Sequence, residues 1–250
     1  MASAWKTGGP IGSVLFAAGR GERLRPLTDR VPKPAIPVGG VPLGAFALSA
    51  LARVRPPVIV NTSHLAEKVV AALEPFAAPG TVEFTLERPR PLGTAGTLRA
   101  LRHRVHATLL TMNADFLTDL EPCALLHTHQ EAGALATLAV QPVTTGADLA
   151  LRGSRAMELI DRHADAQRSG ALYLGAAAFE PSALDLLGET GPDGLAEALL
   201  RPLVERGEAA VAVHTGYALD VGTPERLERA AHDVEAGRGP PRPARRRRPS

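Results

Sequence analysis

Over its first half the chain alternates short apolar runs with segments of helical spacing, and few folds accommodate such a pattern. Strands of a parallel sheet are buried on both faces and read as continuous runs of Val, Ile, Leu and Ala. The helices that cross over between them show a period of 3.6 residues. Strand followed by helix at this spacing predicts an α/β fold: a Rossmann-like, doubly wound, mostly parallel sheet with helices on both faces.

The expected elements follow this pattern along the chain. In the first half we expect strands at residues 13–18, 58–61, 82–86 and 107–112, and helices at residues 43–54, 64–73 and 97–105. The second half is less regular, with expected strands at residues 134–141, 157–160, 171–179 and 210–214, and helices at residues 195–206 and 224–236. We expect one folded domain over residues 1–236.

Composition excludes several classes of protein. The single cysteine, Cys123, rules out an internal disulfide and a multi-cysteine zinc site. The first ten residues lack the apolar core of a signal peptide, and no apolar run approaches the about 20 residues that span a bilayer. The sequence therefore predicts a soluble, cytoplasmic protein without a membrane partner.

The basic isoelectric point has a local origin. Residues 237–250 contain six arginines, four prolines and no acid, so the other 236 residues carry a net charge of −4 although the whole chain carries +2. A mildly acidic body offers no footprint for nucleic acid. We expect residues 237–250 to be a disordered, solvated tail. A weak anion or membrane-surface site is the alternative.

A glycine-rich loop follows the first expected strand. Gly19 and Gly21 lack side chains there, so their backbone amides can approach phosphate oxygens. Arg23 offers a planar guanidinium and Lys33 a point charge to a triphosphate. Taken singly, the glycines are compatible with a tight turn, and Lys33 with a solvent-exposed loop lysine. Their occurrence together, close behind one strand, favours a phosphate site.

This loop carries a family resemblance. The pattern Gly-x-Gly-x-Arg-Leu-x-Pro-Leu-Thr followed by Lys-Pro is complete in residues 19–28 and 33–34, and it resembles the sugar-1-phosphate nucleotidylyltransferases. The resemblance implies that Ala17, Ala18, Gly19 and Gly21 wrap the nucleotide. It also implies that Arg23 contacts the departing pyrophosphate and that Lys33 contacts the reacting phosphates.

Two aspartates are the expected metal ligands. Asp115 follows the strand expected at residues 107–112, and Asp220 precedes Val-Gly-Thr-Pro and the last helix. Ligands gather at the carboxyl edge of such sheets, and Mg²⁺ takes a few protein oxygens together with substrate phosphates. In the family, both positions resemble the metal-binding aspartates. A helix cap at Asp115 and an Asx turn at Asp220 are the structural alternatives.

The nucleobase is expected near a second motif. Pro-Leu-Gly-Thr-Ala-Gly, residues 91–96, looks most like the segment that meets the base in mannose- and heptose-1-phosphate guanylyltransferases. The candidate base-binding residues are Glu87, Pro91, Gly93, Thr94 and Ala95. Glu87 would accept hydrogen bonds from a guanine edge, and an exposed charge at the end of a strand is the alternative reading.

The sugar side departs from the family pattern. Glu-Lys-Pro is absent, and Tyr173-Leu-Gly175 stands where Asn-Ala-Gly is usual, so Tyr173 and Gly175 are the candidate sugar contacts. In this respect the chain is closer to short uridylyltransferases that act on N-acetylmuramate 1-phosphate. An unusual sugar or a cyclitol phosphate is compatible with these departures.

The resemblance as a whole implies a Mg²⁺-dependent enzyme. It would transfer a nucleoside monophosphate, from GTP as the first choice, to a sugar 1-phosphate or similar phosphate, and would act as a monomer or homodimer. Transfer from UTP or dTTP is the first alternative, and a nucleotide-sugar-binding protein without catalysis is the second. Nucleic acid is not an expected partner.

Overall fold

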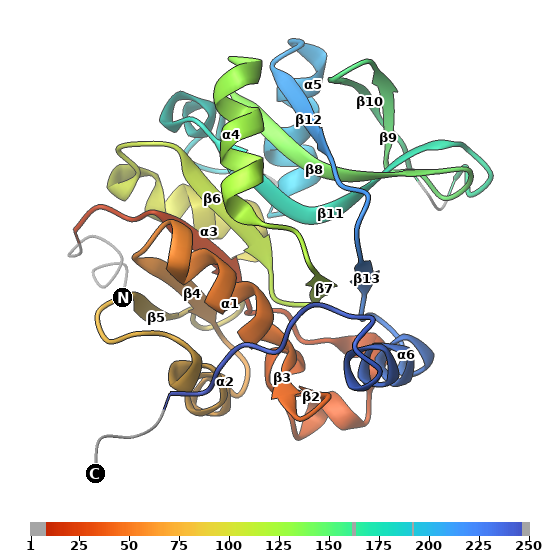
Figure 1. The fold of residues 1–250 in the computed structure, drawn as a ribbon. Helices are drawn as coiled ribbons and strands as arrows, with labels where there is room; N and C mark the ends of the chain where they lie inside the picture. Colours follow the sequence, from red (N-terminus) through yellow and green to blue (C-terminus); the bar gives the residue numbers. More distant parts are fainter. Residues whose placement is uncertain (1–8, 162–163, 192, 247–250) are drawn as a thin grey trace. The chain divides into compact units, whose positions relative to one another are not determined.

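The computed structural model describes residues 9–161, 164–191 and 193–246, and the chain divides into two compact units. Unit I comprises Ile11–Pro91, Thr111–Glu121 and Gly216–Ser250. Unit II comprises Met1–Pro10, Leu92–Leu110 and Pro122–Thr215. The chain passes between the units several times, so the alternation of strand and helix along the sequence does not mark their boundaries (Figure 1).

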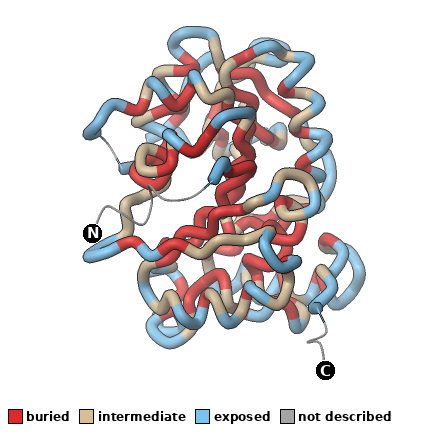
Figure 2. Tube along the Cα trace, turned by 90° about the vertical axis from the view of Figure 1, so that its left-hand side faces the viewer, coloured by how far each residue is buried: buried red, intermediate tan, exposed pale blue. Residues whose placement is uncertain are grey.

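Unit I is built on parallel strands in the order β5-β4-β1. Every position of β1 and β4 is buried, as expected for apolar runs covered on both faces. Figure 2 colours the buried stretches of the chain red. Strand β6 (Leu109–Asn113) begins in unit II and belongs to unit I from Thr111 onward. The elements of unit I are β1 (Ser13–Phe16), β2 (Pro37–Val38), β3 (Val41–Pro42), α1 (Leu43–Val54), β4 (Val58–Thr62), α2 (Ala66–Leu73), β5 (Val82–Leu86), the end of β6 (Leu109–Asn113), β7 (Phe116–Thr118), β13 (Ala218–Asp220) and α6 (Pro224–Glu235).

Unit II differs from the prediction of a mostly parallel sheet. Strand β12 pairs with β8 in parallel, but β8 with β11, β12 with β10, and β10 with β9 are antiparallel. A short connection explains the last of these pairings, because a two-residue loop, Gly153-Ser154, can join only antiparallel strands. The elements are α3 (Gly93–Leu101), α4 (Pro122–Ala132), β8 (Ala136–Val143), β9 (Leu149–Arg152), β10 (Arg155–Leu159), β11 (Gly170–Phe179), α5 (Arg201–Glu205) and β12 (Ala209–Val213).

Helix α3 begins at Gly93, four residues before the helix expected at residues 97–105. The two glycines and the threonine at its start have weak helix propensity, and contacts within unit II hold this turn in place. The Ala95 amide donates to the Asp193 carbonyl at 2.9 Å, and the Leu195 amide donates to the Thr94 hydroxyl at 2.9 Å. Among the described helices, none is both long and apolar enough to cross a membrane.

The carboxyl-terminal segment was expected to be disordered from residue 237, yet residues 237–246 lie against unit I. Arg238 binds the Asp233 carboxylate through Nε and Nη2, at 3.2 and 2.9 Å. Arg246 donates from its backbone amide to Pro75 and from Nη1 to Ala77. These donors find carbonyl and carboxylate acceptors that sequence composition does not reveal. Residues 247–250 lie outside the described part of the chain.

The contact between Arg238 and Asp233 predicts how stability depends on pH. The hydrogen bond from Arg238 holds the pKa of Asp233 below its ordinary value of 3.8. A carboxylate with a lowered pKa contributes stability that is present above its unfolded pKa and lost as the pH falls through the folded one. We therefore expect Arg238→Gln to lower Tm at pH 7, and the difference from the native protein to shrink as the pH falls below the ordinary pKa of 3.8.

Thermal unfolding followed by circular dichroism between pH 3 and 7 measures this effect. Arg242→Gln is the charge-matched control, because it removes the same charge from the same segment while its guanidinium lies near Gly39. Equal, pH-independent losses in both variants would contradict a specific role for the Arg238–Asp233 pair.

Candidate active site

The glycine-rich loop leaves β1 at its carboxyl end and is fixed by contacts within unit I. Ala17 and Ala18 are buried, whereas Gly19 is exposed and has open space where a side chain would be. Gly21 has a φ of +65°, which L residues rarely adopt, and its carbonyl accepts from the Thr28 hydroxyl at 2.9 Å. A Cβ on Gly21 would also lie 3.2 Å from that of Lys33. The loop is therefore packed directly onto the segment that carries Lys33.

Lys33 is a buried cation, not the exposed loop lysine of the alternative reading. It opens a short 3-10 turn, Lys33–Ala35, and its side chain is only 8% exposed. Its Nζ lies 2.8 Å from Oδ2 of Asp115, whose side chain is 37% exposed. A lysine loses hydration when it is buried, so a carboxylate at this distance is the compensation that keeps the charge in place.

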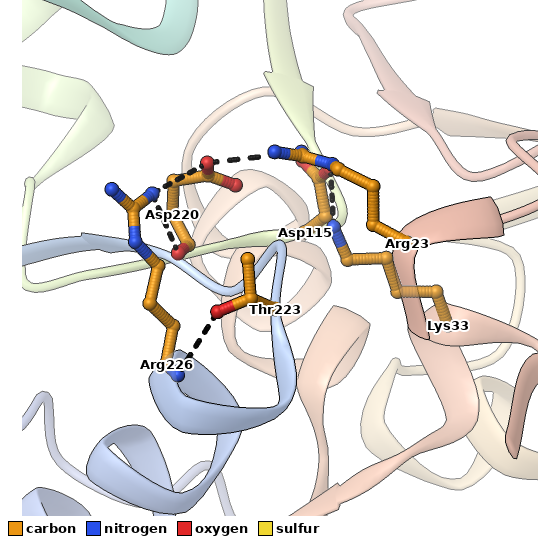
Figure 3. A network of polar contacts seen from close by, with 6 residues as sticks. All are labelled: Arg23, Lys33, Asp115, Asp220, Thr223 and Arg226. Carbon is orange, nitrogen blue, oxygen red and sulfur yellow. Dashed lines mark hydrogen bonds and ion pairs between the residues drawn. The ribbon is translucent and has the colours of Figure 1, made fainter. Parts of the chain in front are cut away.

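The two predicted metal ligands lie beside each other. In the antiparallel pair β7–β13, Asp220 is opposite Phe116, and the Val221 amide donates to the Asp115 carbonyl at 3.0 Å. The Ala114 amide in turn donates to the Phe16 carbonyl at the end of β1. Both carboxylates thus stand at the carboxyl end of β1, where the glycine-rich loop begins (Figure 3).

Arg23 reaches the same place from the loop. Its Nη2 lies 3.9 Å from Oδ2 of Asp220, and two-thirds of its side chain is exposed. The guanidinium passes so close to Gly222 that a Cβ there would lie 2.5 Å from Nη2. Gly222 therefore has a steric role, since any side chain at this position would move the guanidinium of Arg23.

Arg226 is a member of the cluster that the sequence did not indicate. It stands on the first turn of α6, and its Nη1 lies 2.9 Å from Oδ2 of Asp220 (Figure 3). The helix start is fixed by Thr223, whose hydroxyl accepts from the Arg226 amide at 3.4 Å. The sequence Thr-Pro-Glu-Arg was a possible signal for Arg226, because the third residue after an N-cap faces back toward the preceding loop.

Glu87 and Asn61 form a buried pair beneath the loop. Glu87 is 1% exposed, so it is not an exposed charge at the end of a strand. Asn61 donates from Nδ2 to Oε1 of Glu87 at 2.9 Å and accepts from the Ala17 amide at 2.7 Å. The Ala17 amide is therefore already engaged within the protein. Asn61 is the residue before the last one of β4, and a polar residue in a fully buried strand was a possible sequence signal for it.

The remaining residues that the sequence suggested for the base and the sugar lie in unit II, with one exception. Pro91 is the last residue of the first segment of unit I, Ile11–Pro91. Gly93 faces Asp193 so closely that a Cβ would lie 2.4 Å from its carbonyl oxygen, and Thr94 and Ala95 make the contacts at the start of α3 given above. Tyr173 lies in β11 and donates its amide to Oδ2 of Asp148 at 2.9 Å. Gly175 has a φ of +67°, within a shift of register in that strand.

The two acids suit a cation that brings ligands of its own. Among the described residues, no group of three or more His, Cys, Asp and Glu side chains could hold a metal, so the chain forms no complete cage there. Mg²⁺ is commonly held by one or two carboxylates together with substrate phosphates and water. Asp115 and Asp220, adjacent across β7–β13 and bordered by three cations, fit that kind of site.

The buried pair beneath the loop yields a stability prediction. Asn61→Ala removes a hydrogen bond from the buried Glu87 carboxylate and from the Ala17 amide, which should cost about 1–3 kcal/mol in the free energy of unfolding. Urea unfolding at pH 7 measures the loss. In the background of Glu87→Gln, Asn61→Ala should lower the free energy of unfolding by less. A buried neutral amide that loses one hydrogen bond is destabilised less than a buried carboxylate that loses one. An equal cost in both backgrounds would contradict coupling between the two side chains.

Comparison with known proteins agrees with this geometry. Residues 12–148 match the model of the nucleotidyl transferase family. An N-acetylmuramate α-1-phosphate uridylyltransferase from Neisseria meningitidis is 29% identical over 226 residues, which are 87% of this chain and 96% of that protein. A mannose-1-phosphate guanylyltransferase from Mycobacterium tuberculosis is 26% identical over 239 residues, or 92% of this chain and 66% of that protein.

A solved structure shares the fold. A protein from Bacillus anthracis, assigned as a glucose-1-phosphate thymidylyltransferase and crystallised with sucrose, superposes with a TM-score of 0.76. At 18% identity, the alignment covers 90% of this chain and 95% of the other. The family match spans more than half of the chain and includes the glycine-rich loop, Lys33 and Asp115. The chain is therefore an enzyme and belongs to the nucleotidyl transferase family.

Proposed function

We propose that this enzyme transfers a nucleoside monophosphate from a nucleoside triphosphate to a sugar 1-phosphate, giving a nucleoside diphosphate sugar and pyrophosphate. The observation that carries this proposal is the cluster at the end of β1, where Arg23 and Lys33 meet the adjacent carboxylates of Asp115 and Asp220. A triphosphate needs cations and a metal, and this cluster offers both kinds of partner. The relatives named above act on sugar 1-phosphates and support the acceptor class.

The chemistry asks for positioning and charge rather than for a protein base. A phosphate oxygen of the sugar 1-phosphate attacks the α-phosphorus of the nucleotide, and a new P–O bond forms. The bond from the α-phosphorus to the bridging oxygen breaks, and pyrophosphate leaves with the electron pair. A phosphate monoester dianion is nucleophilic as it stands, so no side chain has to remove a proton.

Each residue of the cluster has a role in this scheme. The backbone of the exposed Gly19 and the half-exposed Gly21 would face the nucleotide phosphates, and the largely exposed guanidinium of Arg23 would hold the departing pyrophosphate. Lys33 is held rigidly and stabilises charge on the reacting phosphates. Asp115 and Asp220 would hold Mg²⁺, which, when bound, neutralises the phosphate oxygens. Asn61 and Glu87 support the loop by fixing Ala17.

GTP is the first choice of nucleotide. Pro-Leu-Gly-Thr-Ala-Gly, residues 91–96, resembles the guanylyltransferase motif, and the relative from Mycobacterium tuberculosis is a guanylyltransferase. UTP is the second choice, favoured by a separate observation: the uridylyltransferase from Neisseria meningitidis matches this chain over 96% of its own length, whereas the guanylyltransferase is matched over 66%. Glu87, buried against Asn61, gives neither base an exposed carboxylate.

A substrate matrix tests the proposal. The four common nucleoside triphosphates and dTTP are each incubated with a panel of sugar 1-phosphates and Mg²⁺, and pyrophosphate release is measured. We expect release that requires both a nucleotide and a sugar phosphate, with the highest kcat/KM for GTP and a hexose 1-phosphate. Release with UTP and N-acetylmuramate 1-phosphate alone would select the second choice. No release from any pair would overturn the catalytic role.

The metal role of the aspartates gives a second test. Asp115→Asn and Asp220→Asn replace a carboxylate oxygen by a neutral one, and each should lower kcat by at least about a hundredfold. In Asp220→Asn the asparagine oxygen can still accept from Arg226, so Tm should change little. Asp115→Asn leaves the buried Lys33 charge beside a neutral amide and should lower Tm, with the fold retained. Steady-state rates over a range of Mg²⁺ concentrations measure the loss. Full activity of either variant at limiting Mg²⁺ would contradict metal binding by that residue.

A further inference from the structure

Arg226 folds back from the start of α6 onto the end of β13. Its Nη1 lies 2.9 Å from Oδ2 of Asp220 and 3.4 Å from the carbonyl oxygen of the same residue. About half of the Arg226 side chain is exposed, whereas that of Asp220 is 20% exposed. The guanidinium therefore covers Asp220 from the solvent side, held by two oxygens of a single residue.

Two guanidinium groups share one oxygen of Asp220. Arg23 approaches Oδ2 at 3.9 Å and Arg226 at 2.9 Å, so the contact with Arg226 is the closer by far. On the neighbouring strand, Asp115 is paired with Lys33 at 2.8 Å. The five side chains have a formal charge of +1, so both acids are already compensated without a metal (Figure 3).

A divalent cation that binds Oδ2 has to replace this contact. A guanidinium at hydrogen-bond distance takes up lone pairs of the carboxylate, and its positive charge repels a second cation at close range. A triphosphate brings the opposite charge and provides both the metal and Arg226 with new partners. The arrangement thus disfavours a free cation and favours a cation that arrives with phosphate.

We propose that Arg226 is an internal competitor for the metal site: it holds Asp220 before the nucleotide arrives and weakens the binding of free divalent cation. This inference rests on the metal role proposed for Asp220. Removing the guanidinium should tighten cation binding to the nucleotide-free protein by about three- to tenfold, the range expected when one partly exposed charge next to a ligand is removed.

Binding of Mn²⁺ to the nucleotide-free, full-length protein tests this without any turnover. Free Mn²⁺ is followed by its paramagnetic resonance signal at constant ionic strength, and circular dichroism verifies the fold of each variant. Arg226→Gln should lower the Kd, and Arg226→Lys, which keeps the charge, should stay near the native value. Arg229→Gln is the matched control, because it removes the same charge from α6 at a residue that pairs with Asp233.

The background of Asp220→Asn identifies the route of the effect. If Arg226 competes at Asp220, Arg226→Gln should leave the remaining Mn²⁺ affinity of Asp220→Asn unchanged. An unchanged or weakened affinity in the single variant, an equal gain in Arg229→Gln, or no Mn²⁺ binding to either the native protein or Arg226→Gln would each overturn the inference. Weaker GTP binding in Arg226→Gln without a change in Mn²⁺ affinity would also overturn the inference. Arg226 would then bind phosphate and would not compete with the cation.

These outcomes are separate from those of the substrate matrix. A tighter Kd for Mn²⁺ in Arg226→Gln together with no pyrophosphate release from any substrate pair would sustain the competition and overturn the proposed reaction. Normal catalysis by the native protein together with an unchanged Kd for Mn²⁺ in Arg226→Gln would sustain the proposed reaction and overturn the competition.

Discussion

The pairing of β7 with β13 is the constraint on which the candidate site depends. These two short strands come from distant parts of the chain, and the Val221 amide, bound to the Asp115 carbonyl, fixes their register at the point that matters. A slip by one residue would turn Asp220 to the other face of the strand. The hydrogen bond from Ala114 to Phe16 then ties this pair to the end of β1. Backbone contacts alone therefore bring both acids to the glycine-rich loop, before any side chain contributes.

Hydrophobic patterns along the sequence predicted the bounds of single helices and strands but not the direction in which strands pair. Helix α1 and strand β5 have the bounds that periodicity indicated, because their apolar residues recur along the sequence at the spacing of a helix and of a strand. The sequence also pointed to Asp115, which follows the buried strand β6, and to Asp220, which ends β13. The antiparallel pairings of unit II were missed, because a run such as that of β8 reads the same whichever way its partner runs. Strand direction is set by connections and not by composition.

Residues whose importance comes from a distant partner were harder to recognise. Arg226 reads as one more charge on an exposed helix face, and only its return onto Asp220 sets it apart. Asn61 looks like a loop cap until its side chain is found between the Ala17 amide and Glu87. The alternative reading of Glu87 as an exposed charge is wrong, because folding buries it with that partner. Hydrogen bonds between segments that are far apart in the sequence do not recur at a regular spacing, so a pattern along the sequence cannot predict them.

The cluster is ordered before any substrate binds, and its charges explain how. Lys33 is buried, and leaving it without a carboxylate would cost several kcal/mol, so Asp115 serves the fold as well as the chemistry. The same pairing removes the cost of orienting the lysine when phosphate arrives, which is what preorganisation requires. Arg23 is different, since its contact with Asp220 is long and its side chain mostly exposed. One cation is therefore buried and paired closely, whereas the other is largely exposed, and Gly222 leaves the space that the guanidinium of Arg23 occupies.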